Sequence, residues 1–356
     1  MWRTMKWSVD TTSELTDVLA NEWAELASRA SASPFMYPGW INAWWRAFGS
    51  GSLAILVLRR GGSLAGVLPL MRRRGALMST TNWHTPEYSP FAEDDDALTE
   101  LIRAAFARTS IRLDLSFVDD DSPAIEACSR IARVAGFDPL VRTVHLSPYL
   151  EIQGDWSTYE AGLPARKTAK YRRFRKRLEE RGQVSIEVAD GSDRLAELLR
   201  QGFDVEALGY EHRPSRGVAI LANRETTQFY LEVAAWAAAR GWLRLWMLRL
   251  DETPIAFAYG LEHDGAYFDL KLGFDPQYAR FGPGVLLMRE RIRHAFASSL
   301  ARFEFLGAAE RHKLDWTSTV RDLRRVQEFA PTAAGAANRI AWTHGRPIAK
   351  RLIRGG

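Results

Sequence analysis

An alternating strand followed by a glycine-opened helix, within residues 254–316, restricts the fold of this chain more than any other feature. In residues 266–272, Phe268, Leu270 and Leu272 place an apolar side chain at every second position. A period of two predicts a strand that buries one face. The apolar segment before it, which ends in the turn sequence HDG, predicts a hairpin partner for this strand.

The helix after this strand opens with Gly282, Pro283 and Gly284. Pro283 suits the first turn of a helix, because no hydrogen bond is lost there with its missing N–H. The side chains that follow at helical spacing are apolar, namely Val285, Met288, Ile292, Ala295 and Phe296. A helix opened by glycines leaves N–H groups pointing outward, where they can hold a pyrophosphate. A tight turn before a core helix would use the same residues, so both interpretations stay open.

Composition predicts a folded cytoplasmic protein of about two domains. The chain has 356 residues, of which 46% are hydrophobic, and 13 Trp, so it can bury a large core. Cys128 is its one cysteine, which fits a reducing compartment. The first ten residues lack a signal sequence, and no apolar run is long enough to span a membrane.

The positive charge is concentrated in two segments. Residues 166–181 hold nine Lys/Arg and two acids, and residues 339–354 hold five Lys/Arg and no acid. These segments carry +7 and +5 of a net +5, so the remainder of the chain carries −7. We therefore expect an anionic partner at 166–181 rather than general DNA binding. The basic C-terminal segment could lie on the inner face of a membrane.

A divergent internal repeat predicts two similar domains. The hairpin around residues 58–66 recurs around residues 249–257 at a constant offset of 191, and Trp45 falls opposite Trp236. The predicted boundaries are a first domain at 1–152, a second at 153–329 and a basic tail at 330–356. The first half has no glycine loop before a helix, so a cofactor site is expected only in the second.

Several blocks of the chain, in this order, resemble the GNAT acyltransferase superfamily. The match is carried by PIAFAYGLE at 254–262, GFDPQYARFGPGVLL at 273–287 and FEFLGAAERHKLDW at 303–316, with further matches upstream in the basic block at 170–182 and in EALGY at 206–210. The blocks are similar to the branch of CelD-type cellulose-biosynthesis proteins, which is related to FemAB aminoacyl transferases. This resemblance implies an α/β (α+β) fold of two tandem GNAT-like domains. Each would be a mixed, mostly antiparallel sheet flanked by helices.

The resemblance also implies direct attack of an amine or hydroxyl, such as that of a sugar or polysaccharide precursor, on an acyl-CoA. Glu310 is the expected base, and Asp269 and Lys313 complete the candidate catalytic set. The oxyanion donor is expected near residues 272–274, where Gly273 permits a bulge. The family pattern has a basic residue or Gln at the position of Ala279. The cofactor-binding candidates are Arg280, Gly282, Gly284, Val285 and Leu286.

The acceptor is expected to meet the polar loop that follows EALGY. The substrate-binding candidates are Tyr210, His212, Arg216 and Lys271. Asp269 and Lys271 share one face of the alternating strand, where they either face substrate or form a cross-strand pair. His312 stands where relatives often have Tyr, which leaves the proton donor to the thiolate unassigned.

Two other functions remain open. One is a FemAB-like transferase that takes its aminoacyl group from charged tRNA, which the basic segment would hold. The other is a non-catalytic module that docks on an anionic surface. We expect no metal, because no histidine pair has the spacing of a zinc site.

Overall fold

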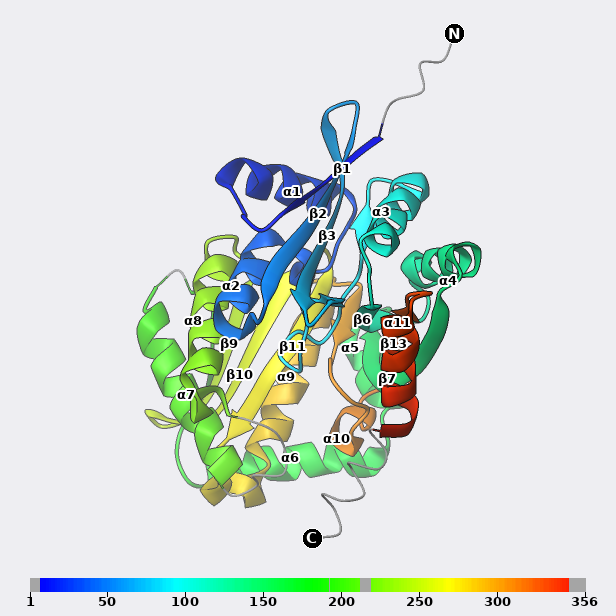
Figure 1. The fold of residues 1–356 in the computed structure, drawn as a ribbon. Helices are drawn as coiled ribbons and strands as arrows, with labels where there is room; N and C mark the ends of the chain where they lie inside the picture. The colour runs from blue at the N-terminus through cyan, green and yellow to red at the C-terminus, as the bar shows by residue number, and fades with distance from the viewer. Residues whose placement is uncertain (1–6, 192, 212–218, 346–356) are drawn as a thin grey trace. The chain divides into compact units, whose positions relative to one another are not determined.

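The computed structural model describes residues 7–191, 193–211 and 219–345. The chain divides into two compact units by its internal contacts. Unit 1 is formed by residues 1–146 and 321–356, as far as these are described, and unit 2 by residues 147–320. Figure 1 labels the elements of both units.

Unit 1 is a six-stranded sheet with helices, joined by one further short strand. Its sheet has the order β1-β2-β3-β4-β6-β13, and β5 pairs with β3. All the neighbouring strands are antiparallel except β4 and β6. The elements are β1 (Trp7–Thr12), α1 (Asp17–Arg29), η1 (Pro34–Met36), α2 (Pro38–Phe48), β2 (Ser52–Arg60), β3 (Ser63–Arg73), β4 (Ala76–Ser79), β5 (Phe91–Ala92), α3 (Asp95–Ala107), β6 (Arg112–Asp119), α4 (Pro123–Ala135), β13 (Val320–Phe329), α11 (Ala333–Ile340) and η5 (Ala341–Gly345).

Unit 2 repeats this plan. Its strand order is β8-β9-β10-β11-β12-β7, and β11 and β12 form its parallel pair. The elements are β7 (Asp138–Glu151), whose last five residues belong to this unit, α5 (Trp156–Gly162), α6 (Ala165–Glu179), β8 (Val184–Ala189), α7 (Leu195–Glu211), η3 (Ile220–Ala222), α8 (Arg224–Ala238), β9 (Leu243–Leu250), β10 (Thr253–His263), β11 (Ala266–Phe274), η4 (Pro276–Phe281), α9 (Pro283–Ala297), β12 (Arg302–Glu304) and α10 (Arg311–Leu314).

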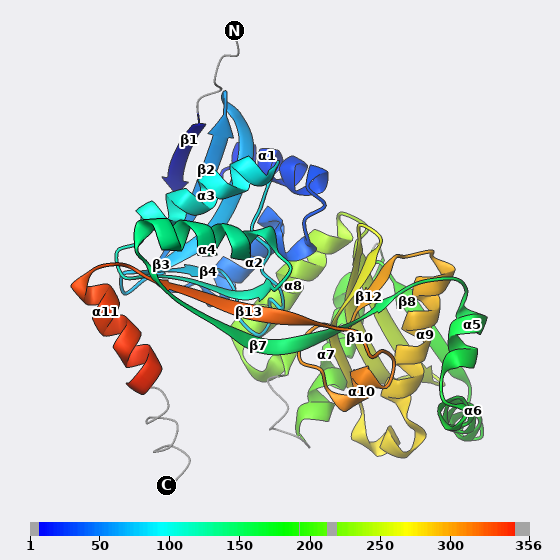
Figure 2. The same cartoon turned by 90° about the vertical axis from the view of Figure 1, so that its right-hand side faces the viewer.

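The two units exchange their last strands. Apart from the short strand β5, β1 to β7 and β8 to β13 follow one order of strand, two helices, three strands, helix, strand, helix and strand, which supports the predicted duplication. However, the end of β7 pairs with β12 in unit 2, and β13 pairs with β6 in unit 1. Residues 321–329 therefore group with unit 1, whereas the predicted second domain extends to residue 329. Figure 2 shows both strands as long ribbons.

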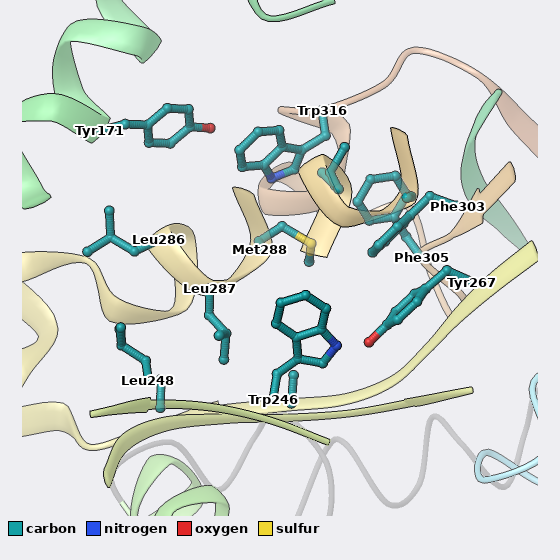
Figure 3. Packing of buried hydrophobic residues seen from close by; sticks show 14 of the residues in the cluster. Tyr171, Trp246, Leu248, Tyr267, Leu286, Leu287, Met288, Phe303, Phe305 and Trp316 are labelled. Atoms are coloured by element: carbon teal, nitrogen blue, oxygen red, sulfur yellow. The ribbon is translucent and has the colours of Figure 1, made fainter. Parts of the chain in front are cut away.

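The core of unit 2 lies between the sheet and α9. Figure 3 shows Leu286, Leu287 and Met288 of α9 packed toward Trp246 and Leu248 of β9. α9 begins at Pro283, as predicted from the sequence. α6 carries most of the basic segment at 166–181, and its Tyr171 and Leu178 are buried. On the opposite face of the sheet, α7 packs against β10 and β11, and α8 packs against β9.

In unit 1 the helix that corresponds to α9 is α3. Asp94 is its N-cap, and Asp95 and Asp96 fill its first turn. The side chain of Asp94 accepts a hydrogen bond from the Ala97 N–H at 2.8 Å. These carboxylates occupy the end of the helix that attracts anions, so they oppose a pyrophosphate there. This observation supports the expectation that the cofactor site lies in the other half of the chain.

Candidate active site

Strands β11 and β12 separate after a short parallel pairing. β12 pairs with β11 only from Ala266 to Phe268, although β11 continues to Phe274. Beyond this point the described residues place no strand on that edge of β11. Its backbone N–H and C=O groups are therefore available to another molecule.

A bulge in β11 lies directly after the separation. Tyr259 of β10 pairs with Lys271 and the next residue, Gly260, pairs with Asp269, so Leu270 is the extra residue. A bulge reverses the alternation of side chains along the strand. The sequence prediction placed the bulge at Gly273, three residues too late, because a glycine permits a bulge but does not fix the register.

The bulge puts Asp269 and Lys271 on opposite faces of the sheet. Asp269 faces α9, where it forms an ion pair with Arg291, and Lys271 faces α7, where it lies beside Glu206. The prediction that Asp269 and Lys271 share one face was therefore wrong, as was a pair between them. The strand also buries both faces, since Tyr267, Phe268 and Asp269 are all less than 9% exposed.

Asp269 is held by a buried guanidinium. Arg291 is fully buried, donates to the Asp269 carboxylate, and also donates to Leu287 O at 3.4 Å. Burial raises the pKa of Asp269, while the charges of Arg291, Lys313 and His312 oppose this rise. An enclosed carboxylate with a fixed partner is suited to orienting neighbouring charges rather than to taking a proton from a substrate.

Lys313 forms hydrogen bonds with the segment that follows β12. Its Nζ donates to Leu306 O at 2.6 Å and to Ala308 O at 3.3 Å. Leu306 and Gly307 both have positive φ values, of 54° and 58°, so this segment turns sharply away from β11. Burial lowers the pKa of Lys313, and the carboxylates of Asp269 and Glu310 oppose the change. Lys313 thus stabilises the segment that separates the two strands.

Glu310 lies on the exposed side of the same region. It precedes α10, its side chain is 57% exposed, and its Oε2 lies 3.2 Å from His312 Nδ1. The three candidate catalytic residues are therefore neighbours at the separation of β11 and β12, with Lys313 interacting electrostatically with both carboxylates. Glu310 is the member of the set that solvent reaches most readily.

The glycine loop at the start of α9 is closely packed. A Cβ at Gly282, where φ is +61°, would lie 2.4 Å from the ring of Phe174 on α6, and one at Gly284 would lie 3.1 Å from the ring of Phe274. Both glycines therefore have a packing role, which is the alternative that the sequence left open. We expect Glu at position 284 to disturb folding as well as any bound anion.

Fewer backbone donors face outward at this loop than the sequence predicted. The N–H groups of Gly282, Val285 and Leu286 donate to backbone carbonyls of Ala279 or Gly282, at 3.0 to 3.1 Å. Among the described residues, no backbone oxygen accepts from the Gly284 N–H. One donor at the positive end of α9 thus remains for a phosphate.

Three guanidinium groups gather beside this helix end. Arg177 of α6, Arg181 just beyond the end of α6 and the exposed Arg280 all lie over the ring of Phe281, at 5.9, 5.8 and 4.7 Å from its centroid. Cations at a helix N-terminus attract and orient phosphate groups. The glycine loop, Arg177, Arg181 and Arg280 therefore form an anion cradle, a positively charged surface that suits phosphate groups.

A second polar pair lies on the α7 face of β11. Glu206 is fully buried, and its Oε2 accepts from the Ile220 N–H at 2.9 Å. Its Oε1 lies 3.6 Å from Lys271 Nζ. Burial raises the pKa of Glu206 and lowers that of Lys271, and each charge opposes the shift of the other. Lys271 was predicted to bind substrate, and it lies on the face of the sheet opposite to the face that α9 covers.

Some of the predicted residues lie beyond the described parts. His212 and Arg216 fall outside the described residues, and so does the side chain of Tyr210, whose backbone is in α7. Within the described chain, no three His, Cys, Asp or Glu side chains are placed to share a metal ion. In the same residues, no helix is both long and apolar enough to cross a membrane.

Sequence analysis did not identify Arg291 or Glu206, although each is a charged residue among the apolar positions of its helix. Arg291 occupies an inward position of α9, since Leu287, Met288 and Ala295 on the same helix are buried. Glu206 has the same relation to the buried residues of α7. A charge on the apolar stripe of a helix indicates a buried partner.

The family model of the Acetyltransferase (GNAT) domain matches residues 165–314. No match was found among curated proteins. Among solved structures, FemX has 10% identity and a TM-score of 0.61, covering 89% of this chain and 96% of that chain. The C-terminal domain of a candidate lysylphosphatidylglycerol synthetase from Agrobacterium fabrum has 13% identity and a TM-score of 0.55, covering 89% of this chain and 94% of that one.

At these identities the solved structures establish a shared fold. A conserved protein of unknown function from Bacteroides thetaiotaomicron has 11% identity and a TM-score of 0.56, covering 90% of this chain and 100% of its own. Together, these likenesses extend the common fold over both units. Residues 165–314 match a GNAT-type acetyltransferase domain, which supports a transferase.

Proposed function

We propose that unit 2 transfers an acyl group from an acyl-CoA to an amine or hydroxyl acceptor. The observation that carries this proposal is the free edge of β11, from Asp269 to Phe274, which lies beside the anion cradle at the start of α9. A thioester against that edge would meet backbone N–H donors, as an oxyanion requires. The anion cradle would bind the phosphates of an elongated donor, and the free edge of β11 would bind its thioester end.

The residues around the free edge suit direct attack. Coenzyme A supplies an activated thioester and a thiolate leaving group. Glu310 is exposed and would accept the proton of the attacking group, and the nearby Lys313 would supply positive charge or a proton to the thiolate. Asp269 and Arg291 would act as positioning residues, because their buried ion pair fixes the charges beside Lys313.

The acceptor would approach from the α7 face of β11. Lys271 and Glu206 provide polar atoms there, and a polar acceptor such as a sugar or polysaccharide precursor suits them. This acceptor class extends the CelD-like resemblance of the sequence. We place the reaction in the cytoplasm, in keeping with the single cysteine of the chain.

The second candidate donor is an aminoacyl-tRNA. Its 3′ end also carries phosphates, so Arg177, Arg181 and Arg280 would suit it equally. The fold shared with FemX supports aminoacyl transfer as the second candidate reaction, because the sequence resembles FemAB transferases as well. A non-catalytic module that binds anionic surfaces would use the same cations without the free edge of β11.

Calorimetric titration with acetyl-CoA and with charged tRNA distinguishes these functions. We expect a sub-millimolar Kd for acetyl-CoA, weakened at least tenfold by R280E or R177E, which is about 1.4 kcal/mol of binding energy. R173E is the matched control, because Arg173 is an exposed cation of α6 that makes no ion pair among the described residues. Salt-sensitive tRNA binding without CoA binding would instead favour the aminoacyl transferase, and binding of neither donor would exclude both reactions.

A further inference from the structure

A groove runs along the side of α9 that faces away from β11. Two adjoining cavities, of about 590 and 860 Å³, share Arg175, Ile186, Glu290 and Arg293 among their lining residues. Both volumes fall within or close to the range of small-molecule sites, about 300–1,000 Å³. α6 and α9 form the walls of this groove, and β8 and β9 form its floor.

The floor of the groove is apolar and incompletely covered. Val184, Ile186 and Val188 point from β8 to this face, and Leu248 of β9 and Leu286 of α9 continue the surface. Val184 and Ile186 are only partly buried, and Val188 is 45% exposed. Four residue steps along β8 span roughly 13 Å. This strip is therefore long and narrow, as an extended hydrocarbon chain requires.

The walls of the groove carry an excess of positive charge. The first cavity is lined by Arg172, Arg175, Lys176, Arg289 and Arg293, and by three glutamates, Glu160, Glu179 and Glu290. The glutamates pair with three of the arginines, since Arg175 bonds to Glu179, Arg289 to Glu160 and Arg293 to Glu290. Arg172 and Lys176 have no ion pair among the described residues and lie one turn apart on α6.

The groove is separate from the anion cradle described above. Arg177 of α6 and Arg181, which follows α6, lie over Phe281, whereas Arg172 and Lys176 of α6 line the groove. On α9, likewise, Arg289 and Arg293 line the groove, and Arg291 faces Asp269. The two helices thus present different side chains to the two sites.

We propose that this groove binds a long-chain phosphate ester, with its hydrocarbon chain on the β8 floor and its phosphate at Arg172 and Lys176. A guanidinium binds a phosphate through two parallel hydrogen bonds, and the adjacent ammonium adds a point charge. An apolar strip that ends at unpaired cations matches an amphiphile of this charge. The proposal is independent of the donor and acceptor of the acyl transfer.

Titration of the full chain with dodecyl phosphate, below the concentration at which it forms micelles, tests this proposal. We expect saturable binding that strengthens by up to about fourfold for each methylene added in a series of chain lengths. Charge reversal at both positions, R172E with K176E, should weaken binding at least tenfold. R173E should weaken binding by less than twofold, because Arg173 does not line the groove.

A second variant separates ligand loss from unfolding. I186D places a charge on the floor and should abolish binding of dodecyl phosphate, while acetyl-CoA binding and the far-ultraviolet circular dichroism stay unchanged. Equal binding of inorganic phosphate, no dependence on chain length, or equal weakening by R173E would each overturn the proposal. So would binding of an RNA hairpin, but not of dodecyl phosphate, through Arg172 and Lys176.

Discussion

The buried carboxyl group of Glu328 in unit 1 makes the stability of this protein depend on pH. Glu328 lies on β13, opposite Leu113 of β6, and its side chain is fully buried, with no hydrogen bond from any described residue to either oxygen. Burial, and next the carboxylate of Asp138, raise its pKa from an ordinary 4.5 to about 8. The Cys128 thiol also faces it, and burial raises the pKa of that thiol. Glu328 is therefore protonated in the folded protein at neutral pH.

The sign of the effect follows from proton binding. Between pH 4.5 and 8 the folded state holds a proton on Glu328 that the unfolded state releases. The free energy of unfolding must then fall as pH rises through this window. The pKa of Glu328 differs by about 3.5 between the folded and unfolded states, and each pKa unit corresponds to about 1.4 kcal/mol. Glu328 can therefore change the free energy of unfolding by at most about 5 kcal/mol, of which about 3 kcal/mol is lost between pH 5.5 and 8.5.

The substitution E328Q tests this reasoning. Gln is close in shape and cannot ionise, so the variant should gain up to about 3 kcal/mol over the wild type at pH 8.5 relative to pH 5.5. Urea unfolding, followed by circular dichroism from pH 5.5 to 8.5, measures the difference between the two proteins. E126Q is the control, because Glu126 is exposed on α4 of the same unit and should leave the pH dependence unchanged. Parallel pH profiles of E328Q and the wild type would refute the argument.

Three further predictions concern unit 2. G282A should destabilise the protein by about 1–3 kcal/mol in thermal unfolding, because φ is +61° and the Cβ would meet Phe174; an unchanged Tm would mean that the loop relaxes freely. R291M should cost about 3–5 kcal/mol because it leaves the Asp269 carboxylate buried without its partner, and adding D269N should recover part of this loss; additive losses would contradict the pairing. E310Q should lower turnover by at least tens-fold with little change in acetyl-CoA affinity, and a rate within threefold of the wild type would assign the base elsewhere.

Local signals in the sequence were sufficient to predict the elements that position the candidate site. Pro283 at the first turn and the apolar spacing after it located α9, and the apolar alternation located β11. Glu310, Asp269 and Lys313 were predicted as candidate catalytic residues; Lys313 interacts electrostatically with both carboxylates, and their roles stay predictions. The predictions of α9 and β11 hold because helix starts, turns and strand periods depend on residues within a few positions of one another.

Tertiary structure decided which strands pair and which side chains face each other. The exchange of β7 and β13 between the units, the bulge at Leu270 and the contact of Phe174 with Gly282 all join residues that are not local neighbours. A shift of one residue in register reverses every side chain beyond it, so alternation alone could not tell that Asp269 and Lys271 face opposite ways. The sequence by itself thus determined the order of the elements, and packing between distant segments determined the partners of each charge, because burial and register arise only when the sheet assembles.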